Sequence, residues 1–277
     1  MEDKLFSVKD KIAIVTGGLG QIGKNIAEEL YKRGAKVAVF TKNLTDSRVE
    51  SIFPKEQYSR DSISFYAVDI NKKESIHKAL DAILDKWEGA PDILVNNAGI
   101  DTQPSAPPEV SGPFETFPEE VFREVVETNL VGTFLMTQAV GERMVKAGKK
   151  GSIINIGSIY GMLSPIQDIY AHKKEQTGTA FIKPVAYSAA KSGIYNLTRY
   201  CATYWGKEGI RVNTLTPAGV WRDTQDETFI RNFTNRMPMG RMSREDEYNG
   251  AVIFLASEAS SFMTGSNLVI DGGWTAW

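Results

Sequence analysis

Residues 12–23 read Ile-Ala-Ile-Val-Thr-Gly-Gly-Leu-Gly-Gln-Ile-Gly. The first four are apolar and mostly β-branched, which predicts a short buried strand. Glycines then follow with the spacing Gly18-x-Gly20-x-x-Gly23, directly before a segment whose apolar residues recur at helical intervals. Such glycines let the backbone turn tightly and approach a pyrophosphate, which the free N–H groups of the helix N-terminus attract. We therefore predict a strand–loop–helix unit that binds a dinucleotide.

The alternation of strands and helices continues along the chain. Further strands are predicted at 37–40, 63–68, 93–95, 152–156, 211–215 and 268–270, and helices at 72–87, 118–147, 187–205 and 243–256. Apolar strands that alternate with helices form parallel sheets covered on both faces. We expect residues 1–277 to form one α/β domain, a doubly wound Rossmann fold with about seven parallel strands.

Three segments interrupt the alternation, and each follows a predicted strand. Residues 101–118 are rich in Pro, Gly and Ser, residues 159–184 are polar, and residues 218–240 contain several arginines. They should emerge at the carboxyl edge of the sheet, where folds of this class bind ligands. We predict that 218–240 is a substrate loop, whereas 101–118 could equally be a variable surface loop.

The composition excludes several kinds of partner. The 277 residues include 32 Lys and Arg against 34 Asp and Glu, without a basic cluster, so neither nucleic acid nor an anionic membrane is expected as a partner. The chain has one cysteine, Cys201, which argues against a disulfide within the chain. With only two histidines besides, His77 and His172, a zinc site is not expected either. Neither a long apolar stretch nor a secretory signal is evident, so we expect a cytoplasmic protein.

The end of the second predicted strand bears on the choice of dinucleotide. An acidic residue commonly binds the ribose 2′-hydroxyl there, but this chain has Thr41 followed by Lys42. A hydroxyl and an ammonium group would bind a 2′-phosphate by donating hydrogen bonds to it, whereas a carboxylate would repel it. This favours NADP(H) over NAD(H), which stays possible, because Lys42 could instead be a solvated surface lysine.

Two Tyr-x-x-x-Lys sequences occur, at Tyr170–Lys174 and at Tyr187–Lys191. Only the second begins a segment with an apolar helical stripe. Residues four apart share a helix face, so the Lys191 ammonium would lie near the Tyr187 hydroxyl and lower its pKa. We assign Tyr187–Lys191 to the chemistry and Tyr170–Lys174 to a loop.

With these motifs the chain resembles the short-chain dehydrogenase/reductase family from about Lys9 to Gly273. The resemblance includes Asn96-Asn97-Ala98-Gly99, Asn129 in Thr-Asn-Leu-Val-Gly, Ser158 in Asn-Ile-Gly-Ser, Tyr187-Ser-Ala-Ala-Lys191, Ile210-Arg-Val-Asn213 and Ile270-Asp-Gly-Gly273. It implies an oxidoreductase that interconverts a carbonyl and a secondary alcohol.

The resemblance also implies roles for individual residues. Tyr187 would be the general acid or base, Lys191 would depress its pKa and bind the nicotinamide ribose, Ser158 would orient the substrate oxygen, and Asn129 would hold a proton-relaying water. The expected dinucleotide contacts are Gly17, Gly20, Ile22, Gly23, Thr41, Lys42, Asp69, Ile70, Asn96, Gly99, Tyr187, Lys191 and Pro217. Asp69 could instead be a helix N-cap, and Ser158 a residue of the turn that ends the strand.

The chain departs from the family pattern in three places. In the glycine loop, Gln21 replaces the middle glycine of the commonest family pattern, which gives a spacing closer to that of the epimerase branch. About 16 residues are inserted between Ser158 and Tyr187. Thr224 lies out of register with the family threonine that contacts the nicotinamide. A sugar-nucleotide epimerase or dehydratase and a non-catalytic dinucleotide sensor are therefore the alternatives.

The insertion suggests the substrate class. Its His172, Lys173, Lys174 and Lys183 would favour a polar or anionic substrate, such as a sugar, a sugar acid or a nucleotide-linked sugar, unless the segment is a solvated surface loop. Leu5-Phe6-Ser7 and Ser158-Ile159-Tyr160-Gly161 resemble bacterial sugar-acid dehydrogenases and flagellin-sugar modification reductases of the family. We expect a homodimer or homotetramer formed by helices 118–147 and 187–205, with the aromatic end Trp274–Trp277 at an interface.

Overall fold

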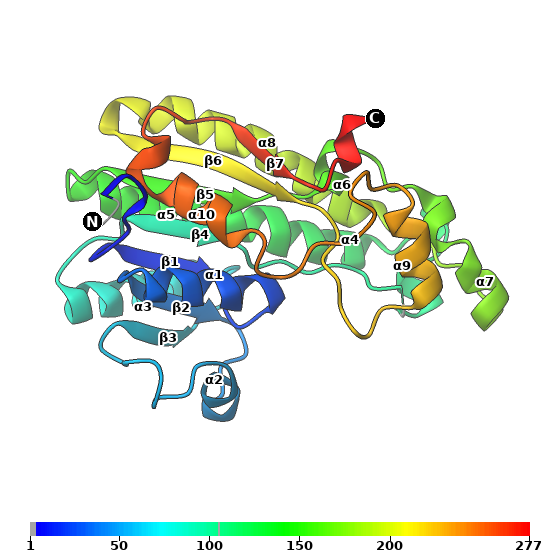
Figure 1. Ribbon diagram of the computed structural model, residues 1–277, viewed down its shortest axis with the longest axis horizontal. Coiled ribbons are helices and arrows are strands. Elements are labelled where there is room, and N and C mark those ends of the chain that lie inside the picture. The colour runs from blue at the N-terminus through cyan, green and yellow to red at the C-terminus, as the bar shows by residue number, and fades with distance from the viewer. Residues whose placement is uncertain (1–3, 105) are drawn as a thin grey trace.

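The computed structural model describes residues 4–104 and 106–277, which form one seven-stranded parallel sheet in the order β3-β2-β1-β4-β5-β6-β7 (Figure 1). The strands are β1 (Ile12–Thr16), β2 (Lys36–Thr41), β3 (Ile63–Ala67), β4 (Ile93–Asn96), β5 (Gly151–Ile156), β6 (Ile210–Pro217) and β7 (Asn267–Ile270). The chain runs outward from β1 to β3 and then crosses back to β4 beside β1. A crevice at such a switch point is where open α/β sheets bind ligands. The predicted fold class is confirmed.

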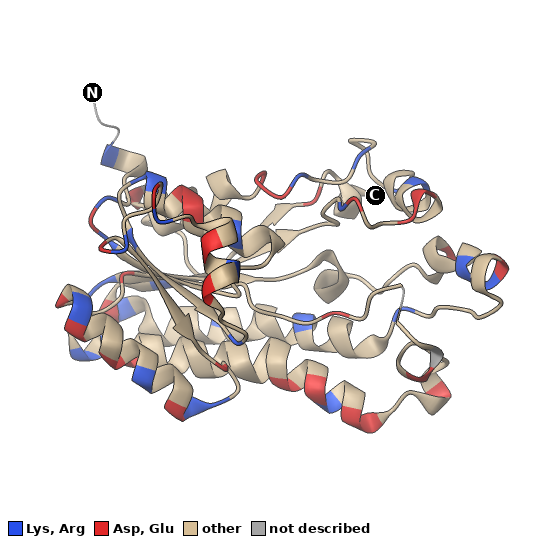
Figure 2. Ribbon diagram, turned by 90° about the horizontal axis from the view of Figure 1, so that it is seen from below, with Lys and Arg blue, Asp and Glu red and all other residues tan. Residues whose placement is uncertain are grey.

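Helices cover both faces of the sheet. They are α1 (Gln21–Lys32), α2 (Asp46–Ile52), α3 (Lys73–Trp87), α4 (Glu119–Val126), α5 (Gly132–Lys146), α6 (Ile159–Met162), α7 (His172–Thr177), α8 (Val185–Trp205), α9 (Glu227–Thr234) and α10 (Asn249–Ala256). One apolar core joins α1 and α10 to the sheet, and a second joins α3, α5 and α8 to its other face. Figure 2 shows acidic and basic residues interspersed along the outer helices.

Two predicted helices differ from the structure. The expected helix 118–147 is divided by a π-helical turn, η4 (Glu127–Val131), between α4 and α5. The expected helix 243–256 begins only at Asn249, because Ser243 forms a bridge with Val220 and its hydroxyl pairs with that of Tyr248 at 2.6 Å. The periodicity of apolar residues does not report either feature, since both depend on tertiary contacts.

The insertion, the segment 229–242 and the C-terminal Trp274 form a third apolar cluster beyond the carboxyl ends of the strands (Figure 1). The predicted loop at Tyr170–Lys174 is wrong, because Tyr170 ends a short helix, η5 (Gln167–Tyr170), and Lys174 lies in α7. Tyr170 is buried against Phe229 of α9, with ring centroids 5.6 Å apart. At the aromatic terminus, Trp274 is likewise buried in this cluster, whereas Trp277 is exposed.

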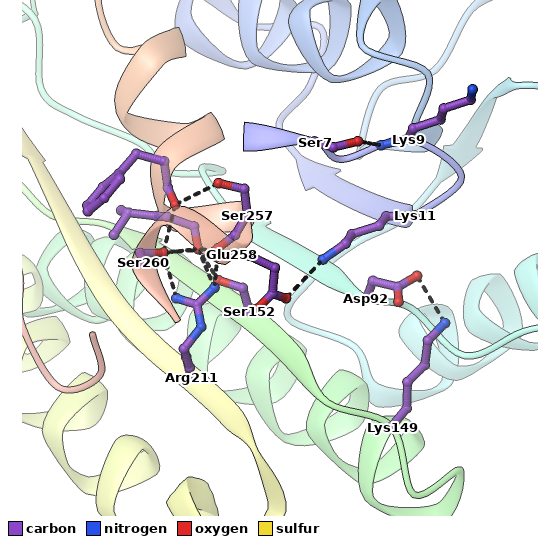
Figure 3. A network of polar contacts seen from close by, with 12 residues as sticks. Ser7, Lys9, Lys11, Asp92, Lys149, Ser152, Arg211, Ser257, Glu258 and Ser260 are labelled. Atoms are coloured by element: carbon purple, nitrogen blue, oxygen red, sulfur yellow. Dashed lines mark hydrogen bonds and ion pairs between the residues drawn. The ribbon is translucent and has the colours of Figure 1, made fainter. Parts of the chain in front are cut away.

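The opposite end of the sheet is held by polar contacts (Figure 3). Arg211 of β6 donates from Nη2 to the main-chain carbonyls of Leu255 and Ser257 at 2.8 and 3.2 Å, and from Nη1 to Ser260 Oγ at 2.9 Å. A guanidinium group at the end of a helix satisfies carbonyls that have no partner within it. This end therefore ties α10 to the sheet and carries no part of the cavity described below.

Within the part of the chain that the structure describes, no helix is long and apolar enough to span a membrane. The same residues contain no cluster of His, Cys, Asp and Glu side chains suited to a metal ion.

Candidate active site

A cavity of about 700 Å³ lies at the carboxyl ends of the strands. The glycine loop, the ends of β4, β5 and β6, the insertion and the 218–240 segment all contribute to its wall. Of the predicted site residues, those that line it are Gly17, Gly20, Ile22, Thr41, Gly99, Ser158, Tyr187, Lys191 and Pro217. The other predicted residues, Gly23, Lys42, Asp69, Ile70, Asn96 and Asn129, do not appear in its wall.

The glycine loop packs against the segment that follows β4. Gly17 has φ +63°, and a Cβ there would lie 2.9 Å from Ala98 Cα. A Cβ on Gly23 would lie 2.4 Å from the carbonyl oxygen of Gly17. Asn97 Nδ2 donates to the carbonyl oxygens of Thr16 and Gly17 at 3.0 and 3.3 Å. The glycines therefore bring the first turn of α1 to the cavity, and Asn97 holds the loop there.

The residues after β2 are arranged differently from the prediction. Lys42 is largely exposed, and its Nζ lies 3.2 Å from Asp69 Oδ2, outside the cavity wall. Arg48 of α2 lines the cavity instead, and its Nη2 donates to the Leu19 carbonyl at 3.2 Å. Arg48 was not among the residues expected from the sequence, because no helix was predicted at α2. The signal was Thr45, which precedes that helix and whose hydroxyl accepts from Arg48 N.

Asn96 is the clearest correction among the predicted dinucleotide contacts. Its side chain is buried in the core, where Nδ2 donates to Thr137 Oγ1 at 2.9 Å and to Asn155 Oδ1 at 2.8 Å. Residues of a strand point alternately to the two faces of the sheet. Asn96, the last residue of β4, therefore links β4, α5 and β5 rather than facing a ligand.

Tyr187 and Lys191 lie one turn apart on α8, beside the end of β5. Lys191 is buried, and its Nζ donates to the Ile156 carbonyl at 2.7 Å and lies 5.8 Å from the centre of the Tyr187 ring. The Ser158 hydroxyl forms a hydrogen bond with the Tyr187 side chain. Tyr195, which the sequence analysis did not single out, donates from its hydroxyl to the Ser158 carbonyl at 2.8 Å. The structure thus brings Tyr187, Lys191 and Ser158 together.

Burial dominates the proton affinities of this pair. It raises the pKa of Tyr187, as does the nearby Asp101 carboxylate, while the hydrogen bond with Ser158 acts against the increase. Burial lowers the pKa of Lys191 to about 8. The expected lowering of the Tyr187 pKa is therefore wrong for this structure, because burial of the phenolate and the Asp101 carboxylate both raise it.

The Asn129 side chain does not reach the cavity wall. Its Oδ1 accepts from the Ile100 amide and its Nδ2 donates to the Ile100 carbonyl, both at 2.8 Å. Asn129 lies within the π-helical turn, a feature that is frequent at functional sites. Both ends of the amide hold the segment after β4, and each keeps one further hydrogen-bonding position.

The insertion supplies one side of the cavity. Tyr170 and Tyr160 line it, with their hydroxyl oxygens 3.1 Å apart, and Lys173 and Lys183 reach it as well. The buried Lys183 forms an ion pair with Asp101, which is more exposed and was not among the residues predicted from the sequence. Lys174 is not among the lining residues. The insertion is thus part of the cavity rather than a solvated surface loop.

Gln21 connects the glycine loop to the 218–240 segment. Its Nε2 donates to the Trp221 carbonyl at 2.7 Å, and its Oε1 accepts from Arg222 Nε at 2.5 Å. Thr224, which is out of register with the family threonine, lines the same cavity. At the position where the family commonly has a glycine, Gln21 therefore binds the 218–240 segment to the glycine loop.

Comparison with known proteins identifies the class to which this fold and site belong. The family model described as enoyl-(acyl carrier protein) reductase matches residues 19–275. A 2-dehydro-3-deoxy-D-gluconate 5-dehydrogenase of Bacillus subtilis is 34% identical over 278 residues, covering 97% of this chain and 96% of that protein. The chain belongs to the short-chain dehydrogenase/reductase family of oxidoreductases.

Other relatives extend the comparison. An NAD-dependent glycerol dehydrogenase of Listeria innocua is 32% identical over 277 residues, covering 99% of this chain and 97% of that protein. A D-threitol dehydrogenase of Mycolicibacterium smegmatis is 32% identical over 278 residues, covering 98% of this chain and 95% of that protein. None of these three relatives is named as an epimerase, a dehydratase or a sensor, so the alternative functions are not favoured.

Two solved structures share the fold over nearly the whole chain. A short-chain dehydrogenase of Leptospira borgpetersenii with bound NAD+ has a TM-score of 0.83 and 34% identity, covering 99% of this chain and 96% of that one. A gluconate 5-dehydrogenase of Burkholderia cenocepacia in complex with NADP and tartrate has a TM-score of 0.81 and 29% identity, covering 99% and 98%.

Proposed function

We propose that this protein interconverts a secondary alcohol and a carbonyl on a sugar or polyol, with a nicotinamide dinucleotide as the second substrate. The observation that carries the proposal is the meeting of Tyr187, Lys191 and Ser158 in one cavity with the glycine loop. The names of relatives that specify glycerol, D-threitol and gluconate support the substrate class.

The residues of the cavity fit a dinucleotide. Gly20, Gln21 and Ile22 line it at the first turn of α1, where the backbone N–H groups have no partner within the helix. Among the described residues other than its two chain neighbours, the one atom within 4 Å of a Cβ built on Gly20 is the Gly17 carbonyl oxygen at 3.1 Å, so this space is open to a ligand. Gly17, Gly20 and Ile22 would hold the pyrophosphate, and Pro217 would lie at the nicotinamide end.

We infer a preference for NADP(H), with NAD(H) also accepted. Thr41 and Arg48 both line the cavity, and the residue at the end of β2 is a threonine instead of an acid. An arginine binds phosphate through paired N–H donors. Lys42 would contribute only if it released Asp69, so Arg48 replaces it as the main candidate for contact with the 2′-phosphate.

The side chains divide the chemistry among them. The nicotinamide ring, when bound, supplies the hydride acceptor for alcohol oxidation or the hydride donor for carbonyl reduction. Tyr187 takes the proton of the alcohol as a phenolate or returns it as a phenol, and Ser158 holds the reacting oxygen by a hydrogen bond. The Lys191 ammonium stabilises the phenolate and would bind the nicotinamide ribose. Asn129, which also holds the segment after β4 through Ile100, would hold a proton-relaying water.

We also propose that the chain assembles through α5 and α8. Phe134, Tyr200 and Tyr204 expose apolar rings on these helices, and the two tyrosine rings stack with centroids 6.0 Å apart. Exposed aromatic groups of this kind mark association surfaces. Light scattering during size exclusion should give a dimer or tetramer, whereas a monomeric mass would contradict this assignment.

Two measurements on the purified protein test the proposed function. Fluorescence titration with NADPH and with NADH should show binding of both and a lower Kd for NADPH. With the corresponding oxidised dinucleotides, alditols or aldonates should then be oxidised, as followed by nicotinamide absorbance. Binding of neither dinucleotide, or a lack of turnover with both substrate classes, would overturn the proposal.

A further inference from the structure

A partly buried ion pair lies in the wall of the cavity beside Tyr187. Lys183 Nζ is 2.6 Å from each carboxylate oxygen of Asp101, and it donates a third hydrogen bond to the Thr102 carbonyl at 2.9 Å. The Lys183 side chain is only 4% exposed, whereas that of Asp101 is 31% exposed. The carboxylate is thus fully paired with the ammonium yet still accessible from the cavity.

The pair belongs to the reacting end of the cavity. Lys183 Nζ lies 5.5 Å from the centre of the Tyr187 ring. The Asp101 carboxylate is near enough to raise the pKa of both Tyr187 and Lys191. The first turn of α1, where a dinucleotide would place its phosphates, lines another part of the wall. A substrate bound against Tyr187 would therefore meet Asp101 and Lys183.

The other basic side chains of the insertion also face a carboxylate or lie elsewhere. Lys173 Nζ is 3.8 Å and His172 Nε2 is 3.2 Å from a carboxylate oxygen of Asp226. Lys174 is exposed and is not among the lining residues. Each insertion lysine that reaches the cavity thus faces a carboxylate, so the insertion adds hydrogen-bonding groups without adding net positive charge.

We infer that Asp101 and Lys183 together determine substrate specificity and select a neutral sugar or polyol over a sugar acid. The Asp101 carboxylate accepts hydrogen bonds from substrate hydroxyls, and the Lys183 ammonium donates to a hydroxyl oxygen. Tyr160, Tyr170 and Phe229 give the same part of the cavity aromatic surface against which the C–H groups of a polyol can pack. This inference rests on the proposed function.

The same pair disfavours an anionic substrate. A substrate carboxylate placed here would lie against Asp101, and the cation nearest to that carboxylate, Lys183, is already bound to it through both oxygens. Specificity arises from such a repulsive group as much as from attraction. In a partly buried site the repulsion is weakly screened, so removing either charge of the pair should change which substrate class reacts.

The test compares kcat/KM for alditols and for aldonates of the same chain length, using the full-length enzyme and its preferred dinucleotide. We expect the wild-type protein to favour the alditol at least about tenfold. Asp101→Asn leaves Lys183 as an unpaired cation, so the alditol-to-aldonate ratio should fall at least about tenfold. Lys183→Met leaves Asp101 unpaired, so the ratio should rise. Lys174→Ala, on the exposed side of α7, is the matched control and should leave the ratio unchanged.

The outcomes separate this inference from the proposed function. If the wild-type enzyme prefers aldonates, or if both variants keep its ratio, the specificity role is wrong while the oxidoreductase proposal stands. If neither substrate class reacts, both fail. Circular dichroism and the thermal midpoint establish that each variant is folded. Asp101→Asn and Lys183→Met should shift the alditol-to-aldonate ratio in opposite directions, so either variant tests the inference alone.

Discussion

Lys191 donates a hydrogen bond from Nζ to the main-chain carbonyl of Ile156 at 2.7 Å, so the end of β5 fixes the position of the ammonium. The same atom lies 5.8 Å from the ring centre of Tyr187, one turn earlier on α8. A long lysine side chain has many rotamers in solution, and this backbone contact restricts them. The proposed acid–base group therefore depends on a junction between a strand and a helix as well as on the spacing of two residues.

The first prediction concerns pH. Oxidation needs the Tyr187 phenolate and should accelerate as pH rises, whereas reduction needs the phenol and should slow. Burial raises the pKa of Tyr187 and lowers that of Lys191 to about 8. A positive charge beside a phenol favours the phenolate, so we expect the ammonium to oppose the increase at Tyr187. Lys191→Met should reduce kcat about 100-fold and move the rising limb of the oxidation profile to higher pH by about one unit.

The measurement is the pH dependence of kcat/KM in both directions for the wild-type enzyme and the variant. An unchanged limb in Lys191→Met would show that the lysine does not act on the proton affinity of Tyr187.

A second prediction distinguishes two cations near the end of β2. Arg48→Ala removes a guanidinium group from the cavity wall and should raise the KM for NADPH at least about tenfold, with little effect on NADH. Lys42→Ala is the comparison, because Lys42 pairs with Asp69 outside the wall, and it should change either KM by less than about threefold. Equal effects on NADPH and NADH would contradict a 2′-phosphate contact.

The contact between Gln21 and the 218–240 segment gives a third prediction. Gln21→Gly restores the commoner glycine spacing but removes the hydrogen bonds to Trp221 and Arg222. We expect faster amide hydrogen exchange in residues 218–226 and about three- to tenfold faster dinucleotide release, since each hydrogen bond contributes roughly 1 kcal/mol. Stopped-flow displacement measures the release rate, and an unchanged rate would mean that the contact does not retain the ligand.

Gly23 gives a prediction about stability. In Gly23→Ala the new methyl group would lie 2.4 Å from the backbone oxygen of Gly17, which cannot move without distorting the loop. We expect a loss of about 3 kcal/mol in the free energy of unfolding. Gly206→Ala is the control, because nothing lies within 4 Å of its Cβ position and its φ of −55° suits alanine. Denaturant titration should leave the control unchanged or slightly more stable.

The sequence predicted the sheet and the Tyr187–Lys191 pair because both depend on local periodicity. Buried parallel strands are continuous apolar runs, and a helix places residues four apart on one face. The Asp101–Lys183 pair could not be predicted in this way, since its partners are 82 residues apart and neither segment is regular. The inward direction of Asn96 and the double hydrogen bond of Asn129 are likewise set by packing between elements.

Arg48 and Lys42 show the same limit at shorter range. Lys42 directly follows β2 and was therefore the predicted contact for the 2′-phosphate. In the structure its ammonium forms an ion pair with Asp69, which follows β3. Arg48 reaches the cavity because a seven-residue helix turns it back toward Leu19. The periodicity of so short a helix is too weak to detect, although its threonine N-cap was visible in the sequence.

The most direct test compares the two tyrosines of the Tyr-x-x-x-Lys sequences. Both line the cavity, but only Tyr187 lies beside Lys191 and Ser158, whereas the Tyr170 hydroxyl pairs with that of Tyr160. Tyr187→Phe should lower kcat for alcohol oxidation by about 10²- to 10⁴-fold and leave the Kd for the dinucleotide within about threefold. Tyr170→Phe should lower kcat less than about tenfold. Retained turnover in Tyr187→Phe, or an equal loss in both variants, would contradict the assignment of the chemistry to Tyr187.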